Sequence, residues 1–417
     1  MLQICTTHNH SGSQTVQKII TKSLESSIGS QELSNNIKFL NASNYDSNQI
    51  SLELSKYLQN INPEFREKIL QHYLTLNLNN VDPYIINNEI SKQFVALIKD
   101  DLLKNMTYVI EVNPGYGLIT QNLLKAGIPF IHLWESHNEF YPVLQNLKNI
   151  FPNQVKITQA NLLKMSKMLN LNKAYESHTF NTYNRHISGL FNNISKRKWE
   201  EESCMQIIGI STNYRFIRHL IISTIFQTGF MMYGRTIFYL ALSPSIWAKL
   251  TCHGSGSSTN YIMFNTLFNY TVFGTLDRKG FLPWQKIKKS NNKHKNVLLQ
   301  ADNELFYLVK IEPRPDLLTL FREKEHLIYF WHFVRHHLYK SSSRVIPTLE
   351  KIMPGFGIKL IEKNYNIFTQ FKELNFNQML DIYMEFKSWP EFKQSSFLPG
   401  ANDILETYEP YKEGDSN

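Results

Sequence analysis

The segment EVNPGYGLIT, from Glu111 to Thr120, is the most informative part of this sequence for the fold. It follows the apolar run 108–112 and opens a helical pattern, so it lies where a strand passes into a helix. Gly115 and Gly117 allow a sharp turn and a close approach of the backbone to a ligand. Glu111 ends the strand and can pair with an amine, which favours a cationic group over the pyrophosphate of a dinucleotide.

Outward from this turn, strand-like runs alternate with helical patterns. Ile90, Phe94 and Ile98 mark an amphipathic helix before the first strand. Further strand-like runs are 130–134, 155–158, 206–208, 236–242, 280–282 and 305–309. The alternation predicts an α/β fold with a parallel, doubly wound sheet. The second strand leads into Glu135, which is placed to accept hydrogen bonds from ribose hydroxyls.

The chain divides into three segments by texture. Residues 1–80 form an Asn- and Ser-rich arm, and residues 1–24 contain no acid, which suits an organellar presequence in part, although they also lack arginine. Residues 81–315 carry the α/β pattern, with a polar insertion at 164–204 and a buried helix leading into a strand at 219–234. Residues 316–417 are predicted to form a helical C-terminal domain with an acidic tail.

Composition narrows the class of protein. The 417 residues are 42% hydrophobic and carry a net charge of +9, so we expect a large core and a polyanionic partner, either nucleic acid or a membrane surface. Three cysteines far apart in sequence argue against a disulfide scaffold or a zinc ribbon and favour a reducing compartment. No uncharged apolar run reaches the ~20 residues of a membrane span, so no membrane-spanning segment is expected. Of the two polyanionic partners, nucleic acid is predicted and a membrane is not.

Two basic clusters lie in the C-terminal half, within the run 278–295 and in the turn 340–344. Either could line a groove for phosphates, or be a solvated loop. The nucleic-acid-binding candidates are Lys286, Lys288, Lys289, Lys293, Lys295 and Arg344. The aromatic residues near these clusters could stack on bases or belong to the core; they are Phe281, Trp284, Tyr329, Trp331 and Tyr339. His332 and His336 have a metal-site spacing but no acid or cysteine beside them, so no metal is expected.

The motif 111–120 resembles the first motif of the rRNA adenine dimethyltransferase family, and 83–86 resembles the short N-terminal motif of that family. Segments 234–237, 281–284 and 311–314 are similar to landmarks of its mitochondrial transcription factor branch. The resemblance covers roughly residues 80 to 350. It implies a Rossmann-like class I methyltransferase domain that binds S-adenosylmethionine. The implied cofactor residues are Ile85, Glu111, Gly115, Gly117, Glu135 and Asn161.

One family motif is degenerate. Family enzymes have Asn-Leu-Pro-aromatic after the fourth strand, where the Asn accepts from the target adenine amine and the ring stacks on the flipped base. Aligned without a gap, Ile210 replaces that Asn and Asn213 the aromatic residue; a shift by one leaves Ser211 and Tyr214 there. The degenerate positions are Ile210, Ser211, Thr212, Asn213 and Tyr214. Losing one acceptor typically costs on the order of 10²–10³ in rate. Asn161 replaces a usual Asp, which predicts weakened cofactor binding.

The resemblance implies a monomeric transcription factor of the mitochondrial matrix and nucleoid, with weak or absent methyl transfer. Its expected partners are the single-subunit mitochondrial RNA polymerase and melted promoter DNA. The alternative is an S-adenosylmethionine-dependent rRNA adenine dimethyltransferase acting on mitochondrial small-subunit rRNA. The intact first motif favours the alternative, and the degenerate positions favour the transcription factor.

Overall fold

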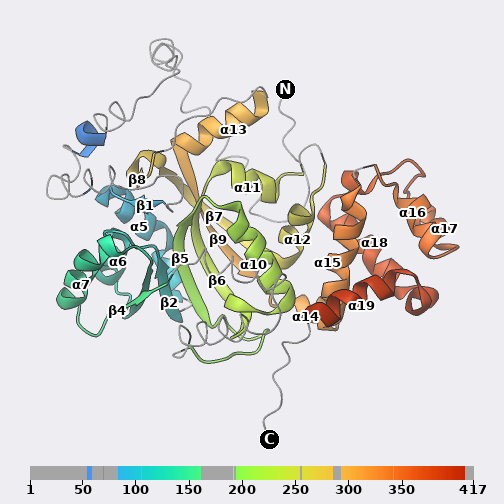
Figure 1. Ribbon diagram of the computed structural model, residues 1–417, viewed down its shortest axis with the longest axis horizontal. Coiled ribbons are helices and arrows are strands. Elements are labelled where there is room, and N and C mark those ends of the chain that lie inside the picture. The colour runs from blue at the N-terminus through green and yellow to red at the C-terminus, as the bar shows by residue number, and fades with distance from the viewer. Residues whose placement is uncertain are drawn as a thin grey trace, which may run out of the picture.

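Seven runs rich in β-branched and aromatic residues form one central sheet in the computed structural model (Figure 1). The structure describes residues 54–58, 69, 83–104, 106–160, 191, 194–253, 256–284, 293–340 and 342–408. The sheet strands are β2 (Tyr108–Val112), β3 (Ile131–Glu135), β4 (Val155–Gln159), β5 (Met205–Ser211), β6 (Thr236–Leu242), β7 (Phe268–Asp277) and β9 (Leu305–Pro313). A separate antiparallel pair joins β1 (Tyr84–Ile85) to β8 (Phe281–Leu282).

The strand order places a topological switch at the centre of the sheet. The order is β4-β3-β2-β5-β6-β9-β7; the first five strands are parallel, and β9 is antiparallel to both β6 and β7. From β2 the chain moves outward through β3 and β4, and then returns to β5 on the other side of β2. In open α/β sheets, ligands bind beyond the carboxyl ends of the two strands that flank such a switch. Val112 and Ser211 are the last residues of these strands here.

Helices cover both faces of the sheet and continue beyond it (Figure 1). In the first half of the chain they are α5 (Asn88–Lys104), α6 (Leu118–Lys125), α7 (Tyr141–Ile150), α10 (Tyr214–Phe226), α11 (Pro244–Thr251), α12 (Thr259–Leu267) and α13 (Lys293–Glu304). After the last strand they are α14 (Leu317–Phe321), α15 (Lys324–Tyr339), α16 (Val345–Ile352), α17 (Phe356–Glu362), α18 (Phe376–Ser388) and α19 (Phe397–Tyr408). Short 3₁₀ turns are η2 (Asn138–Phe140), η3 (Gly229–Met231), η4 (Arg278–Gly280), η5 (Phe371–Glu373) and η6 (Pro390–Gln394).

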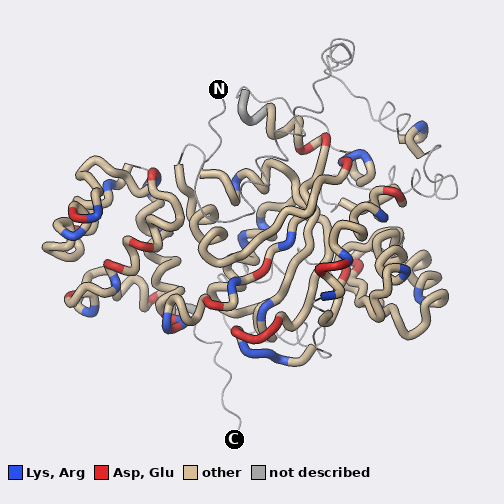
Figure 2. The backbone as a smooth tube through the Cα atoms, turned by 180° about the vertical axis from the view of Figure 1, so that it is seen from behind, with Lys and Arg blue, Asp and Glu red and all other residues tan. Residues whose placement is uncertain are grey.

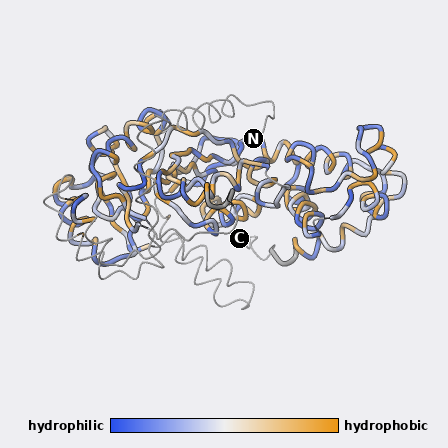
Figure 3. Tube along the Cα trace, turned by 90° about the horizontal axis from the view of Figure 1, so that it is seen from above, coloured by the Kyte–Doolittle hydropathy of each residue, from blue (hydrophilic) through white to orange (hydrophobic). Residues whose placement is uncertain are grey.

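Two hydrophobic cores lie on opposite faces of the sheet. On one face, Phe94 of α5 and Leu123 of α6 pack with Ile208 of β5. On the other face, Phe216 of α10 packs in a cluster that includes Ile207. Strand β5 is buried along its whole length, as expected of a parallel strand covered on both faces. Apolar residues run through both the sheet and the helices beyond it (Figure 3).

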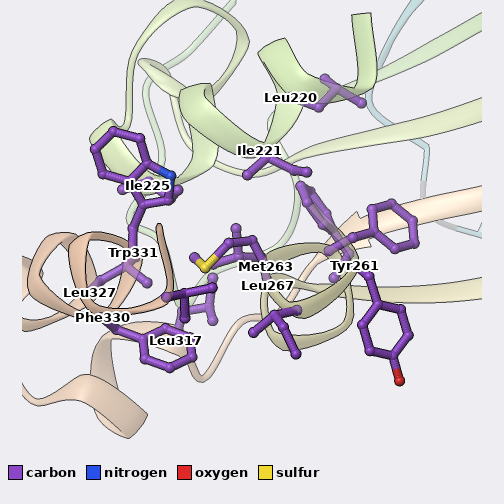
Figure 4. Packing of buried hydrophobic residues seen from close by; sticks show 14 of the residues in the cluster. Leu220, Ile221, Ile225, Tyr261, Met263, Leu267, Leu317, Leu327, Phe330 and Trp331 are labelled. Carbon is purple, nitrogen blue, oxygen red and sulfur yellow. The ribbon is translucent and has the colours of Figure 1, made fainter. Parts of the chain in front are cut away.

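The α10-face core continues into the C-terminal helices. Figure 4 shows Ile225 of α10 and Met263 of α12 beside Leu317 of α14 and Trp331 of α15. Trp331 is 6% exposed and makes an edge contact with Phe226 at a centroid distance of 5.5 Å. The helices after Pro313 therefore share one continuous core with the sheet.

The α/β fold, with its mostly parallel sheet and helical C-terminal region, is confirmed. The expected buried helix at 219–234 is present as α10, which ends at Phe226 before β6 begins at Thr236. Strand β7 was not expected. Its alternating residues Phe268, Tyr270 and Val272 carried a strand signal, but a bulge between Val272 and Gly274 interrupts the alternation.

Candidate cofactor site at the sheet switch point

The glycine loop after β2 turns through left-handed backbone conformations. Asn113, Gly115 and Gly117 have φ values of 53°, 57° and 70°, and Gly117 is the N-cap of α6. A Cβ atom on Gly115 would lie 2.9 Å from the Cβ of Tyr84, so β1 packs directly on this loop. Glycine is needed at 115 for both its backbone conformation and this close approach. Ile85, the other residue of β1, is buried in the α5-face core.

Glu111 is a buried acid with one unsatisfied oxygen. Its side chain is 1% exposed, and the Thr120 hydroxyl donates a 2.6 Å hydrogen bond to Oε2. Oε1 has no hydrogen-bond partner within the described residues. Burial raises the pKa of this carboxyl to about 8, the Thr120 hydrogen bond lowers it, and the charge of Glu135 raises it further. A cationic amine beside Oε1 would supply the missing partner and favour the carboxylate.

Glu135 joins the carboxyl end of β3 to the glycine loop. Its Oε2 accepts a 3.2 Å hydrogen bond from the Gly115 amide. Its Oε1 accepts from the amides of Ser136 and His137 at 2.7 and 2.8 Å. A carboxylate offers about four lone-pair sites, so Glu135 can hold the loop and still accept from a ribose hydroxyl. Asn161, the remaining cofactor candidate, lies outside the described residues.

The degenerate motif lies at the carboxyl end of β5, on the other side of the switch. Ile210 is 8% exposed and packs in the α5-face core. Ser211 is the last residue of the strand and accepts a 3.3 Å hydrogen bond from the Asn213 amide. Asn213 is the N-cap of α10, where its Oδ1 accepts from the Arg215 amide at 2.9 Å. Thr212, between them, is half-buried.

Tyr214 begins α10 and is also engaged. Its hydroxyl accepts a 2.9 Å hydrogen bond from Asn260, and the Lys249 ammonium lies 5.5 Å from its ring centroid. Burial raises the pKa of this phenol. The sequence places these residues on helices α12 and α11, and no pattern in the sequence indicates that they meet Tyr214.

The predicted nucleic-acid residues are only partly within the described chain. Lys286, Lys288 and Lys289 lie outside it, as do the side chains of Lys293 and Lys295, whose backbone begins α13. Arg344 is exposed at the start of α16, with its guanidinium 5.3 Å from the Phe368 ring centroid. Basic and acidic residues are spread over both the sheet and the helices (Figure 2).

Arg278, at the start of the first basic cluster, is not available to phosphates. It is 4% exposed and donates to the carbonyls of Phe281 and Pro283, both at 2.6 Å. Its guanidinium also lies 4.9 Å from the Phe306 ring, and burial lowers its pKa to about 10. The interpretation of the whole run 278–295 as a phosphate-binding surface was therefore wrong at this residue, which instead braces the turn before β8.

Two of the expected base-stacking residues are core residues. Trp331 and Phe281 are buried, Trp331 in the α10-face core and Phe281 against Phe306. Trp284 is half-buried, and its Nε1 donates to the Lys279 carbonyl. Tyr339, by contrast, is 86% exposed. Trp331 could therefore stack on a base only if α15 first separated from the core in which Trp331 packs.

The three sequence landmarks have structural roles. Arg235 is buried and bonds Glu312 Oε1 at 2.6 Å, joining two of the landmarks. It also donates to the carbonyls of Trp199, Glu201 and Pro313. The third landmark contains β8, which pairs with β1 and holds it over the glycine loop.

Within the described residues, no helix is long and apolar enough to cross a membrane. The same residues contain no group of three or more His, Cys, Asp or Glu side chains placed to hold a metal ion.

Comparison with known proteins gives sequence relatives of one kind, although no family model matches the chain. Dimethyladenosine transferase 2, mitochondrial, of Drosophila melanogaster is 28% identical over 77% of this chain and 79% of its own length. The Homo sapiens protein of the same name is 22% identical over 59% of this chain and 62% of its own. Mitochondrial dimethyladenosine transferase 1 of Bos taurus is 28% identical over 34% of this chain and 38% of its own.

Solved structures with similar folds include the 23S rRNA methyltransferase ErmE and a dimethyladenosine transferase from Plasmodium falciparum. Each is 12% identical and covers 73% of this chain, with 100% and 97% of their own chains and TM-scores of 0.46 and 0.45. The sequence relatives confirm the resemblance to the rRNA adenine dimethyltransferase family, and to its mitochondrial members in particular.

Proposed function

This chain resembles the mitochondrial dimethyladenosine transferases over most of its length, and we propose that it is a mitochondrial transcription factor built on their fold. In this proposal it assists the single-subunit mitochondrial RNA polymerase in promoter melting and initiation. It acts as a monomer in the matrix and nucleoid, and it binds the melted promoter strand. The names of the relatives support a mitochondrial location. The polymerase and the promoter are proposed as partners because three segments of the sequence resemble landmarks of the transcription factor branch.

The observation that carries the proposal is the chemistry at the end of β5. Transfer of a methyl group to an adenine amine needs an acceptor that orients the amine at near-attack distance. Ile210 offers no acceptor, and the amide oxygen of Asn213 is used to cap α10. The ring of Tyr214 is held by Asn260 and Lys249. These positions support a chain that binds nucleic acid without efficient methylation.

We also propose that the chain keeps a weakened site for S-adenosylmethionine. The unsatisfied Oε1 of Glu111 fits the ammonium of the methionyl group, and Glu135 fits the ribose. The residues that would hold the cofactor are Ile85, Glu111, Gly115, Gly117, Glu135 and Asn161. When bound, the cofactor supplies an electrophilic methyl group. Glu111 and Glu135 bind and orient it; neither contributes to the chemistry at the target amine.

The same geometry favours one alternative, an rRNA adenine dimethyltransferase acting on mitochondrial small-subunit rRNA. Its support is the intact first motif, in which Glu111 keeps an unsatisfied oxygen and Glu135 accepts from the Gly115 amide. The two proposals make opposite predictions for methyl transfer, because only the enzyme needs an acceptor at the end of β5.

The test measures both activities on the same preparation. We expect no methyl transfer to a small-subunit rRNA hairpin above the level without protein, and promoter-dependent transcription by the polymerase that requires this chain. Dimethylation of the hairpin that Glu111→Ala abolishes would establish the enzyme instead. Calorimetry with S-adenosylmethionine should give heat that Glu135→Ala removes, and no heat at millimolar cofactor would eliminate the weakened site.

A charge variant tests the nucleic-acid surface. Replacing Lys286, Lys288, Lys289 and Arg344 with Gln should weaken binding to bubble-containing DNA of any sequence. The salt slope should fall by roughly 0.7 per lost contact, because each contact releases counterions from a single strand. A matched variant replaces four exposed lysines of α5, α6 and α7 that are not among the predicted nucleic-acid residues, namely Lys99, Lys104, Lys125 and Lys148. Equal salt slopes for the two variants would contradict this surface.

A further inference from the structure

A cavity of about 890 Å³ lies among the C-terminal helices, apart from the sheet switch point. Helices α15 and α16 and the segment around Gly400 in α19 contribute its walls. Its volume is in the range of sites that hold a small organic molecule rather than a lone ion. Lys340 and Ser343 of the basic turn 340–344 belong to its lining, but none of the six residues proposed above to bind nucleic acid is among its described lining residues.

Apart from the Tyr339 phenol, the ionisable side chains that line this cavity are all bases. They are His332, Arg335, His336, His337, Lys340 and Lys351, and no carboxylate is among the lining residues that the structure describes. A concave surface with charges of one sign focuses its field on a ligand of the opposite sign. The remaining lining groups include Ser343 and Thr348, whose hydroxyls can donate to an anion. The lining therefore selects for a negatively charged ligand.

His337 gives an independent sign that the cavity binds a ligand. Its ring is 2% exposed and stacks on Phe371 at a centroid distance of 4.4 Å, which fixes its orientation. Its Nε2 has no hydrogen-bond partner within the described residues. A buried nitrogen left in this state costs roughly 1–3 kcal/mol, so its retention in a core position calls for a partner that the chain itself does not supply.

His332 and His337 are neutral without a ligand, because the pKa of each is well below its usual value. Burial, then the neighbouring His336 and His332, lower the pKa of His337 to about 3. Burial, His336 and Arg335 lower the pKa of His332 to about 4, against the opposing charge of Asp403. A bound anion would raise both values, because it favours the protonated ring. The permanent positive charge facing the cavity comes from Arg335, Lys340 and Lys351.

We propose that this cavity binds a nucleotide through its phosphate group. Arg335, Lys340 and Lys351 supply charge to the phosphate, and His337 donates a hydrogen bond from Nε2. Tyr339 also lines the cavity and is 86% exposed, so its ring can stack on a base. The nucleotide is either free or one unit of a single strand. A metal ion fits the site less well, since no three of the described His, Cys, Asp or Glu residues are placed to ligate one.

The first test compares ligands that differ only in the phosphate, using the full chain. The probe is uridine 5′-monophosphate and not an adenine nucleotide, because an adenine base could also bind at the proposed S-adenosylmethionine site. In calorimetry we expect uridine 5′-monophosphate to bind and uridine to bind at least tenfold more weakly. Equal binding of the two would overturn the proposal, as would absence of binding by both the monophosphate and a single-stranded decanucleotide.

The second test assigns the binding to the cavity. Lys340→Gln with Lys351→Gln, both at exposed positions, should weaken uridine 5′-monophosphate or decanucleotide binding by tenfold or more. The matched control, Lys359→Gln with Lys393→Gln, removes two charges from the same helical region outside the lining and should change affinity by less than twofold. If both pairs weaken binding equally, the effect is general charge and the cavity is not the site.

The third test separates a binding role of His337 from a structural one. His337→Phe keeps a ring against Phe371 and removes the unsatisfied nitrogen, so thermal stability should be unchanged or higher. Ligand affinity should fall at the same time. A variant that melts earlier while binding normally would show that His337 only packs. Competition between the decanucleotide and uridine 5′-monophosphate then shows whether the bound nucleotide is free or part of a strand. A decanucleotide that displaces the monophosphate binds at the same phosphate site.

Discussion

Replacing Glu111 with Gln should change how the stability of the protein depends on pH. The pKa of this carboxyl is raised from 4.5 to about 8 by burial, so the folded state holds a proton that the unfolded state has released. The stability that this proton provides is complete below pH 4.5 and is lost as the pH rises through 8. Between pH 6.5 and 8, linkage gives a loss of about 2 kcal/mol in the free energy of unfolding from this group.

Urea denaturation of the wild type and Glu111→Gln at pH 6.5, 7, 7.5 and 8 measures this loss. Between pH 6.5 and 8, the free energy of unfolding of the wild type should fall by about 2 kcal/mol more than that of the variant. Burial lowers the pKa of His132, His219 and His337 from 6.5 to about 4, 4 and 3, so each of them makes the protein more stable as the pH rises past 6.5. This contribution is the same in the wild type and in Glu111→Gln, so it cancels in the difference between them. Glu139→Gln, at an exposed position, is the control and should follow the wild type. Parallel curves for the wild type and Glu111→Gln would refute the reasoning.

Three further substitutions test the packing around the site. Gly115→Ala should lower the free energy of unfolding by about 1–3 kcal/mol and weaken cofactor binding in calorimetry, because φ is +57° and the new methyl would lie 2.9 Å from Tyr84. Arg235→Met should cost about 3 kcal/mol in urea denaturation, since it removes the ion pair with Glu312 and the donors to three carbonyls, leaving only Lys310 at 3.7 Å beside Glu312. Arg314→Met should cost under about 1 kcal/mol. Trp331→Ala should cost about 3–5 kcal/mol, with no selective loss of affinity for single strands over duplex; a selective loss would restore its stacking role.

The strands whose apolar runs are continuous could be predicted from the sequence. Strand β6 is buried at every residue from Thr236 to Leu242, so its run has no polar gap to mislead the reading. Strand β7 was missed because its bulge at Val272 and Gly274 breaks a period of two. The glycine loop and Glu135 were placed from spacing alone, because a βα turn leaves little freedom between a strand end and the next helix.

Other features depend on contacts that no local pattern records. Arg278 was taken for a surface charge, since its role depends on carbonyls presented by the turn that follows it. For Trp331 the sequence left base stacking and core packing both open, although Leu327 and Val334 flank it at the helical spacing that indicates a buried face. The partners of Tyr214 come from two other helices, and sequence spacing does not predict such meetings.

The core shared between α10 and the C-terminal helices has a consequence for how the protein unfolds. A division near residue 315 stays a prediction from sequence texture, yet Ile225, Met263, Leu317 and Trp331 belong to one cluster across it. Two parts that share a core stabilise each other and unfold together, so heating should give a single calorimetric transition rather than two. A fragment ending at 315 would expose a broad apolar face to water and should aggregate. During synthesis, the part of α10 that packs on α15 (Lys324–Tyr339) therefore stays uncovered long after α12 has been made, and an apolar surface exposed in this way is prone to aggregation.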